Sequence, residues 1–252
     1  MTRRKPTTLR LGTWNMHRGR RPAAALDALQ ALVRDHNNPH ALALQETRDY
    51  LPELREVDGY RLFARRRPRG ADQQAWLVRD DVKARRLVVR DLGGDGWTTT
   101  DGHHHVANKG IQVTIAGWLV GVNVHLPPSI DWPGGLPQGP PDRVQDYREN
   151  VLSLVALARR RRRQGLLYVG DWNNRPGRDD GFVSTTWLAK QAAMTITPTR
   201  GAGGHLHGID FPMVSRRCEL RDVRQGERYG SDHPLVTFTV ERRPVSGSPA
   251  NR

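Results

Sequence analysis

Five apolar segments of this chain each border a side chain that is able to bind a metal ion, a phosphate or a proton. Leu9–Asn15 ends in an asparagine, Ala41–Glu46 in a glutamate and Val120–His125 in a histidine. Leu166–Asn173 ends in Asp-x-Asn, and the triplet Ser231-Asp232-His233 comes directly before a fifth apolar segment. Five such ends are improbable by chance. They predict one active site, assembled where the strands of a sheet end.

Glu46 is the strongest candidate for a metal ligand, because a carboxylate directly after a buried strand has little structural reason to be there. A hard cation held by carboxylate oxygens neutralises a phosphate and the charge that develops on its leaving oxygen. This chemistry suits phosphodiester hydrolysis. The alternative is a solvated or helix-capping acid within the segment Gln45–Asp49.

His233 is the candidate general base for activating a water molecule. Asp210, which follows a glycine in a short apolar segment, is its expected partner, because a buried carboxylate needs one. The alternative for Asp210 is an ordinary acid in a turn.

Four further residues complete the predicted site. Asp171 and Asn173 alternate at a strand end, so they are expected to point to the same side, one holding the water and the other donating to the phosphate. His125 is expected to donate to a phosphate oxygen, and Asn15 to orient Glu46 or a metal-bound water.

Two other chemistries are disfavoured by the sequence. Cys218 has no obvious base beside it, and no Gly-x-Ser-x-Gly segment is present to support a serine nucleophile. The consecutive histidines His103–His105 cannot easily converge on one ion, so a solvated loop is the favoured interpretation.

The elements that must position these residues follow from the apolar periodicity. The patterns predict strands at Leu9–Asn15, Ala41–Gln45, Tyr60–Ala64, Ala75–Arg79, Ala84–Arg90, Ile111–Ile115, Trp118–His125, Leu166–Gly170, Gly208–Val214 and Pro234–Val240. They predict helices that begin at Pro22, near Asp142 and near Ser184. A loop rich in proline and glycine is expected from Pro127 to Pro141.

The chain is strongly basic, with 40 Lys+Arg against 26 Asp+Glu, a formal charge of +14 and a pI near 11.1. Such an excess predicts attraction to polyanions, nucleic acid first among them, although GC-rich coding also inflates arginine. The run Arg159–Arg163 has two interpretations: cations that favour a helix C-terminus, or contacts to a phosphate backbone.

No apolar segment is long enough to span a membrane, and no apolar stretch of a secretory signal follows the basic N-terminus. The single cysteine excludes an internal disulfide. These features favour an intracellular, cytoplasmic protein, and a phage-encoded origin in a GC-rich host is compatible with them.

The ordered motifs resemble those of the endonuclease/exonuclease/phosphatase superfamily, in particular its deoxyribonuclease I-like members. The resemblance rests on six motifs: Trp14-Asn15, Leu44-Gln45-Glu46, Asn123-Val124-His125, Gly170-Asp171-Trp172-Asn173, Ile209-Asp210 and Ser231-Asp232-His233. It places one such domain at 9–241, between a disordered basic segment at 1–8 and a disordered tail at 242–252.

The resemblance implies a four-layered α/β sandwich, with two packed mixed β-sheets flanked by helices, and a Mg²⁺ cofactor for which Mn²⁺ can substitute. It implies that Glu46, Asn15 and Asp232 lie at the metal, and that Asp171 and Asn173 orient water and phosphate. It further implies a catalytic pair of Asp210 and His233, with His125 as the second histidine.

Two candidate substrate contacts lie outside these motifs. In the similar segment of deoxyribonuclease I, the arginine two residues after the glutamate contacts DNA, which makes Arg48 either a DNA contact or a plain surface arginine. Trp132 lies in the loop Ser129–Pro141, where we expect substrate choice to reside. Deoxyribonuclease I supports its second histidine with a glutamate, and the corresponding segment Asp72–Trp76 shows no clear replacement.

These observations favour a metal-dependent phosphodiesterase, an endonuclease or exonuclease that hydrolyses DNA as a monomer. Two alternatives remain open. One is a phosphomonoesterase or phospholipase acting on a small anionic phosphoester, since this superfamily changes specificity through its loops. The other is a non-catalytic module that binds nucleic acid or a host protein, which the complete set of site residues disfavours.

Overall fold

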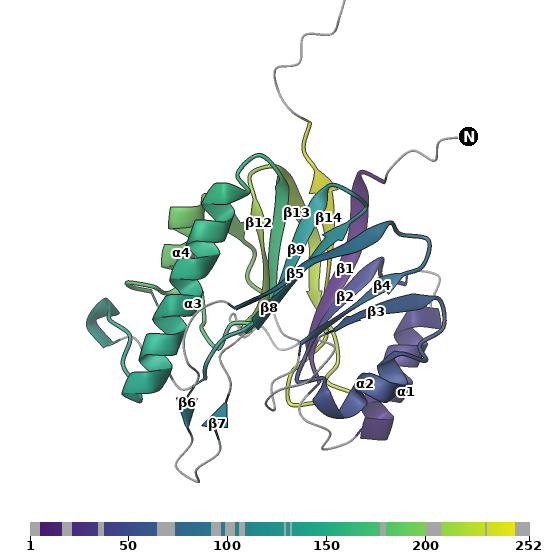
Figure 1. Cartoon of the computed structure of the whole chain (residues 1–252), viewed down its shortest axis with the longest axis horizontal. Helices are drawn as coiled ribbons and strands as arrows, with labels where there is room; N and C mark the ends of the chain where they lie inside the picture. The colour runs from purple at the N-terminus through teal and green to yellow at the C-terminus, as the bar shows by residue number, and fades with distance from the viewer. Residues whose placement is uncertain are drawn as a thin grey trace, which may run out of the picture.

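The computed structural model describes residues 6–16, 22–34, 38–64, 74–91, 97–98, 104–105, 109–128, 130–131, 133–176, 180–199, 208–229 and 231–244. Two six-stranded mixed sheets lie face to face, with helices on their outer faces (Figure 1). The predicted α/β sandwich is confirmed.

The first sheet has the strand order β13-β14-β1-β2-β4-β3. Its strands are β1 (Thr8–Asn15), β2 (Ala41–Gln45), β3 (Tyr60–Ala64), β4 (Ala75–Arg79), β13 (Cys218–Gln225) and β14 (Val236–Arg242). β1 and β2 are parallel and the other neighbours are antiparallel. The ends of β1 and β2 therefore lie at the same edge of this sheet.

The second sheet has the order β11-β12-β10-β9-β8-β5. Its strands are β5 (Ala84–Asp91), β8 (Lys109–Ile115), β9 (Leu119–His125), β10 (Gly165–Asp171), β11 (Met194–Ile196) and β12 (Asp210–Ser215). Again the central pair is parallel, since β9 and β10 run together and place His125 beside Asp171. β12 is antiparallel to β10 and pairs its first residue, Asp210, with Asp171.

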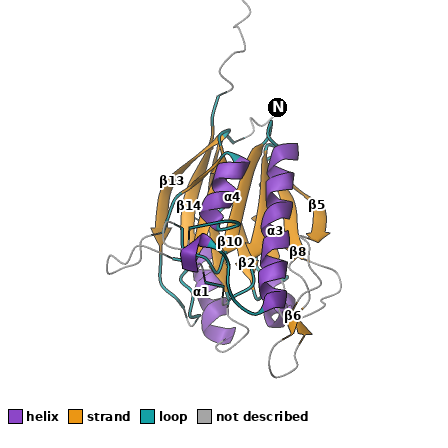
Figure 2. Cartoon of the chain, turned by 90° about the vertical axis from the view of Figure 1, so that its left-hand side faces the viewer, coloured by secondary structure: helices purple, strands orange, loops and turns teal. Residues whose placement is uncertain are grey.

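Helices cover both outer faces. The first sheet packs against α1 (Pro22–Arg34), the short helix η2 (Arg48–Tyr50) and α2 (Leu51–Leu54), and the second packs against α3 (Pro141–Arg160) and α4 (Thr185–Ala192). Figure 2 shows α3 and α4 in front of the second sheet. None of the helices in the described part of the chain is long and apolar enough to cross a membrane.

The core consists of three apolar clusters, one between each pair of layers. Between the sheets, Leu11 and Phe238 of the first sheet meet Val169 of the second, and all three are buried. A helix–sheet cluster on either side completes the core. Each strand in the middle of the molecule is buried on both faces, which explains the continuous apolar segments of β2, β9 and β10.

Most predicted elements are present, with small differences at their ends. β2, β3 and β4 have the predicted bounds, and Ser184 caps α4 by accepting a hydrogen bond from the Trp187 N–H. β14 extends through Arg242. The loop after Pro127 contains one short helix, η3 (Pro133–Gly135).

Four strands were not predicted. β11 has only three residues, and β13 carries four charged side chains among eight residues, so neither shows a clear apolar pattern. The other two unpredicted strands, β6 (Trp97–Thr98) and β7 (His104–His105), pair with each other in a small separate sheet. His104 and His105 thus lie in a strand rather than in a loop, while His103 lies outside the described residues.

Candidate active site

The predicted polar strand ends meet at one end of the sandwich. Asn15 ends β1, Glu46 follows β2, His125 ends β9, and Asp171 ends β10. The Asn15 amide nitrogen donates to both acids, with Nδ2 lying 3.2 Å from Glu46 Oε1 and 3.0 Å from Asp171 Oδ2. One asparagine of the first sheet therefore joins a carboxylate from each sheet.

Glu46 adopts an unusual backbone conformation for a glutamate. Its φ is 53°, in the left-handed region that residues with a β-carbon seldom occupy. The turn follows directly on the five buried residues of β2 and precedes the short helix η2. Local strain of this kind is typical of residues that the fold holds in place for their side chains.

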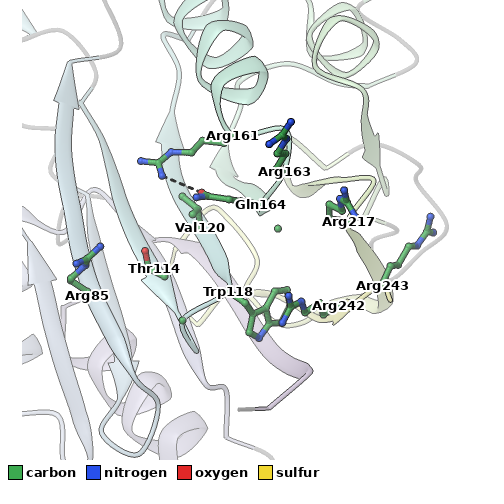
Figure 3. A pocket seen from close by; sticks show the side chains of 12 residues that line it. Arg85, Thr114, Trp118, Val120, Arg161, Arg163, Gln164, Arg217, Arg242 and Arg243 are labelled. Carbon is green, nitrogen blue, oxygen red and sulfur yellow. Dashed lines mark hydrogen bonds between the residues drawn. The ribbon is translucent and has the colours of Figure 1, made fainter. Parts of the chain in front are cut away.

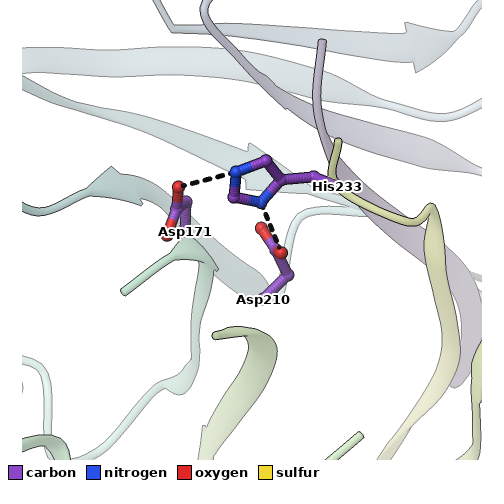
Figure 4. Close-up of side chains that lie close together, drawn as sticks. All are labelled: Asp171, Asp210 and His233. Atoms are coloured by element: carbon purple, nitrogen blue, oxygen red, sulfur yellow. Dashed lines mark hydrogen bonds and ion pairs between the residues drawn. The ribbon is translucent and has the colours of Figure 1, made fainter. Parts of the chain in front are cut away.

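His233 and Asp210 form the closest ionisable pair of the site. His233 Nδ1 lies 2.8 Å from Asp210 Oδ2, and the opposite ring nitrogen, Nε2, lies 3.8 Å from Asp171 Oδ2 (Figure 4). Because Asp210 occupies Nδ1, Nε2 is the atom that faces the centre of the site.

The backbone around His233 is held by two neighbours. Ser231 Oγ donates to the Asn15 carbonyl at 2.7 Å and accepts from the His233 N–H at 3.0 Å. The Trp14 indole N–H donates to the His233 carbonyl at 3.1 Å. Both partners belong to or lie beside β1, so this strand fixes the position of the histidine.

The pKa values of the pair are both raised. Burial and the charge of Asp171 raise the pKa of Asp210 to about 6, against the effect of its hydrogen bond to His233. For His233, burial lowers the pKa, but the hydrogen bond to Asp210 and the charges of Asp210, Asp171 and Asp232 outweigh it and raise the pKa to about 10. Both shifts strengthen the hold of the pair on a proton.

His125 lies on the opposite side of the two acids from β1. It is buried, and its Nε2 is 3.6 Å from Asp171 Oδ2 and 3.9 Å from Glu46 Oε1. Both histidines therefore point a ring nitrogen at Asp171, His125 from β9 and His233 from the segment before β14.

Asn173 is close to Asp171 for a different reason than strand alternation. β10 ends at Asp171, and Asn173 turns away with a φ of 48°. Its N–H donates to Asp171 Oδ1 at 2.9 Å, and its side-chain nitrogen donates to the Leu126 carbonyl at 2.8 Å. The expectation that the two residues alternate on one strand was wrong, because a turn brings them together.

Asp232 and Arg48 lie at the rim. The side chain of Asp232 is more than half exposed, and its Oδ1 lies 3.7 Å from His233 Nε2. Arg48 is exposed at the start of η2, two residues after Glu46. The remaining predicted contact, Trp132, lies outside the described residues.

Two groups of oxygen-rich residues are suited to a cation. The ligand atoms of Asp171, Asp210 and His233 lie within 4.8 Å of one another. However, the short hydrogen bond already joins His233 to Asp210. The corner formed by Asn15, Glu46 and Asp171 offers two carboxylates that converge from both sheets and are oriented by the Asn15 amide, and hard cations prefer such oxygen ligands.

A buried polar network behind the site was missed in the sequence. Asn123 accepts from Gln45 Nε2 at 2.7 Å, and its own amide donates to the carbonyls of Leu44 and Ala75 at 2.8 and 2.9 Å. It thereby ties β9 of one sheet to β2 and β4 of the other. The signal in the sequence is that Gln45 and Asn123 are amides within otherwise apolar strands.

The fold and the site define a class of protein: two packed mixed sheets in a four-layered sandwich, with acids and histidines gathered at one end. The Endonuclease/Exonuclease/phosphatase family model matches residues 12–233, from β1 to His233. The chain therefore belongs to the endonuclease/exonuclease/phosphatase family.

Solved structures share this fold at low sequence identity. A humanized D. rerio TDP2 is 13% identical with a TM-score of 0.65, and the match covers 94% of this chain and 100% of that one. AP endonuclease LMAP from Leishmania major is 15% identical with a TM-score of 0.61, over 94% and 89% of the two chains. D. rerio TDP2 complexed with a single-strand DNA product is 13% identical with a TM-score of 0.62, over 94% and 100%. No curated protein sequence matches this chain.

Proposed function

We propose that this protein is a divalent-metal-dependent phosphodiesterase, a nuclease that hydrolyses DNA by attack of a water molecule. The single observation that carries the proposal is the convergence of Glu46, Asp171 and the Asp210–His233 pair on one space between the ends of the two sheets. Family membership supports the class of reaction.

Glu46 is the residue that would hold the cation, with Asp171 beside it and Asp232 at the rim, while the Asn15 amide orients the two carboxylates. When bound there, Mg²⁺ or Mn²⁺ supplies positive charge to a non-bridging phosphate oxygen and to the leaving oxygen. The donor set fits this role because two carboxylates that converge on one amide nitrogen repel each other unless a positive charge lies nearby.

His233 exchanges the proton at Nε2, while Asp210 fixes the ring through Nδ1. The raised pKa of His233 strengthens it as a proton acceptor. Nε2 takes the proton of the attacking water, and the neighbouring Asp210 carboxylate stabilises the imidazolium that forms. Asp171 orients the water, and His125 contributes a second imidazole beside the phosphate.

Two further observations favour DNA as the substrate. The formal charge of +14 attracts polyanions, and the D. rerio TDP2 neighbour is in complex with a single-strand DNA product. Arg48 and Trp132 are the proposed substrate contacts.

Nicking of supercoiled plasmid tests this proposal. The wild type is expected to nick in Mg²⁺ or Mn²⁺ and to stop when EDTA is added. His233→Ala is expected to lower the rate by about 10² to 10⁴, the usual contribution of a positioned acid or base. His40→Gln, a change to a histidine at the opposite end of β2, is the matched control and is expected to cleave like the wild type.

Absence of cleavage of any DNA or RNA by the wild type would refute the nuclease. Hydrolysis of a phosphoinositide, sphingomyelin or a nucleotide under the same conditions would then assign the site to small phosphoesters.

A further inference from the structure

A cavity of about 420 Å³ lies at the end of the sandwich opposite the active site. Trp118 and Gly165 line it, just before and at the first residues of β9 and β10, whereas His125 and Asp171 are the last residues of those strands. Six residues of strand separate the two ends, which corresponds to roughly 20 Å. The cavity shares no residue with the catalytic site.

Arginines surround this cavity from four different elements (Figure 3). They come from β5, the turn after α3, the β12–β13 turn and the end of β14, and they are Arg85, Arg161, Arg163, Arg217, Arg242 and Arg243. Among the described residues that line the cavity, none is acidic. The other described lining residues are neutral, so the positive charge is not balanced within the cavity.

Few of these charges are engaged elsewhere. Arg161 donates to Gln164, and Arg243 approaches Glu219 at 3.8 Å. No described carboxylate forms an ion pair with Arg163 or Arg217. Converging guanidinium groups without counter-charges repel one another, and a bound anion with several charges relieves that repulsion.

The floor of the cavity is rigid. The Trp118 indole N–H donates to the Pro6 carbonyl at 2.8 Å. A β-carbon built at Gly165 would lie 3.0 Å from the Trp118 ring and 3.1 Å from the Cys218 sulfur, so these groups are closely packed. The arginines thus surround a closely packed floor.

A second basic hollow adjoins the first. It has a volume of about 620 Å³, lies along β3 and β5, and shares Arg85 with the cavity. Arg55, Arg61 and Arg86 line it together with the half-buried Phe63. The positively charged surface therefore extends from the cavity, which alone would hold a compact anion, through Arg85 into the hollow beside Phe63.

We propose that this arginine-lined surface, the cavity and the adjoining hollow together, is an exosite for the phosphate backbone of a single nucleic-acid strand. Arginine recognises phosphate oxygens through its planar fork, and aromatic rings in such grooves stack with bases. The exosite deepens the proposed function, on which it rests, because it would retain the polymer while the opposite end cleaves it.

The continuity of the surface favours a strand over a small polyphosphate. A compact anion needs the cavity alone, whereas a strand follows charges spaced along its backbone. At about 3.4 Å per nucleotide of a stacked strand, the roughly 20 Å between the two ends corresponds to about 6 nucleotides. Affinity is therefore expected to increase with length beyond 6 nucleotides.

Fluorescence anisotropy with a labelled 30-nucleotide oligothymidine in EDTA tests the exosite without turnover. The variant R163A/R217A removes two arginines of the cavity. The control R34A/R224A removes two exposed arginines elsewhere, so the net charge is the same. Circular dichroism of both variants confirms that they fold.

If Arg163 and Arg217 each contact one phosphate, the salt slope of log K falls by about 1.4 and affinity at 0.1 M salt falls about 25-fold. The control is expected to change affinity less than 3-fold and to keep the wild-type slope. Equal losses in the two variants, or no loss in either, would overturn the exosite. Full competition by tripolyphosphate at equal phosphate concentration would also overturn it, in favour of a compact anion site.

The outcomes separate this inference from the proposed function. Arginine-dependent binding by a wild type that cleaves nothing supports the exosite and refutes the nuclease. Plasmid nicking by a wild type whose binding does not depend on Arg163 and Arg217 supports the nuclease and refutes the exosite.

Discussion

Asn123 is predicted to hold the two sheets together behind the active site, and the variants N123A and N123D test this. Asn123 is fully buried. Its amide nitrogen donates to the carbonyls of Leu44 and Ala75, and its oxygen accepts from Gln45. Aspartate has nearly the same shape as asparagine but lacks the amide donor, so the pair of variants separates hydrogen bonding from packing.

The expected losses follow from these contacts. In N123A, Gln45 Nε2 retains Thr13 Oγ1 and the Ala43 carbonyl as acceptors, so the main loss is the donor to two buried carbonyls. At about 1–3 kcal/mol for each buried group left without a partner, unfolding should become easier by about 4 kcal/mol. In N123D a buried carboxylate faces the same carbonyls, and desolvation alone costs about 4 kcal/mol or more at neutral pH.

Urea denaturation at pH 7.5 measures both variants. The expected order of stability is wild type, then N123A, then N123D. Since typical domains have only about 5–15 kcal/mol of stability, a loss of this size is a large fraction of the total, and N123D is therefore measured at 15 °C. If N123D unfolds within 1 kcal/mol of the wild type, the two sheets are held by packing and the reasoning about the network is wrong.

Three further predictions concern other parts of the fold. Gly170→Ala should lower the free energy of unfolding, measured in urea, by about 3 kcal/mol or more, because φ is 143° and the added β-carbon would lie 1.9 Å from the Val124 carbonyl oxygen. A loss below 1 kcal/mol would contradict this. Burial raises the pKa of the Cys218 thiol to about 11, so a thiol reagent at pH 8 should leave the folded protein unlabelled and label one thiol after unfolding; rapid labelling of the folded protein would refute the burial. Burial and Arg79 lower the pKa of His40, so the folded state binds fewer protons and its stability should fall as pH drops below about 6.5. The urea midpoint should therefore fall less between pH 7.5 and 5.5 in His40→Gln than in the wild type, and an equal fall would exclude this role.

The central part of the fold could be predicted because its strands are buried on both faces. β2, β9 and β10 are continuous apolar segments, and each ends abruptly at a polar residue. Such a boundary is visible in a single sequence. β13 lacks that contrast, since half of its side chains are charged and most are at least partly exposed. It pairs with β14, but its sequence shows no apolar periodicity that would predict a strand.

The candidate site divides in the same way. The residue types at the strand ends indicated Glu46, His125, Asp171 and His233, and the structure brings their side chains together. The conformations between the strands were not predictable, as the left-handed turn at Asn173 shows. Chain reversals of this kind depend on tertiary contacts, which here include the Leu126 carbonyl.

The structure also locates the arginine run Arg159–Arg163. The sequence allowed two interpretations of this run, cations that favour a helix C-terminus or contacts to a phosphate backbone. α3 ends at Arg160, and Arg161 and Arg163 line the cavity in the turn that follows. The helix-terminus interpretation therefore fits Arg159 and Arg160, while phosphate contact stays a proposal for Arg161 and Arg163.

The most direct test of the proposed chemistry is the rate of plasmid nicking as a function of Mn²⁺ concentration for the wild type, Glu46→Gln and His233→Ala. Glu46→Gln should need a higher Mn²⁺ concentration for half-maximal rate, because it loses a charged ligand. His233→Ala should reach its plateau at the wild-type concentration, with a plateau lowered by about 10² to 10⁴. A Glu46→Gln enzyme with the wild-type Mn²⁺ dependence and rate would contradict the assignment of the cation to this corner. A His233→Ala plateau equal to that of the wild type would contradict proton transfer at the Asp210–His233 pair.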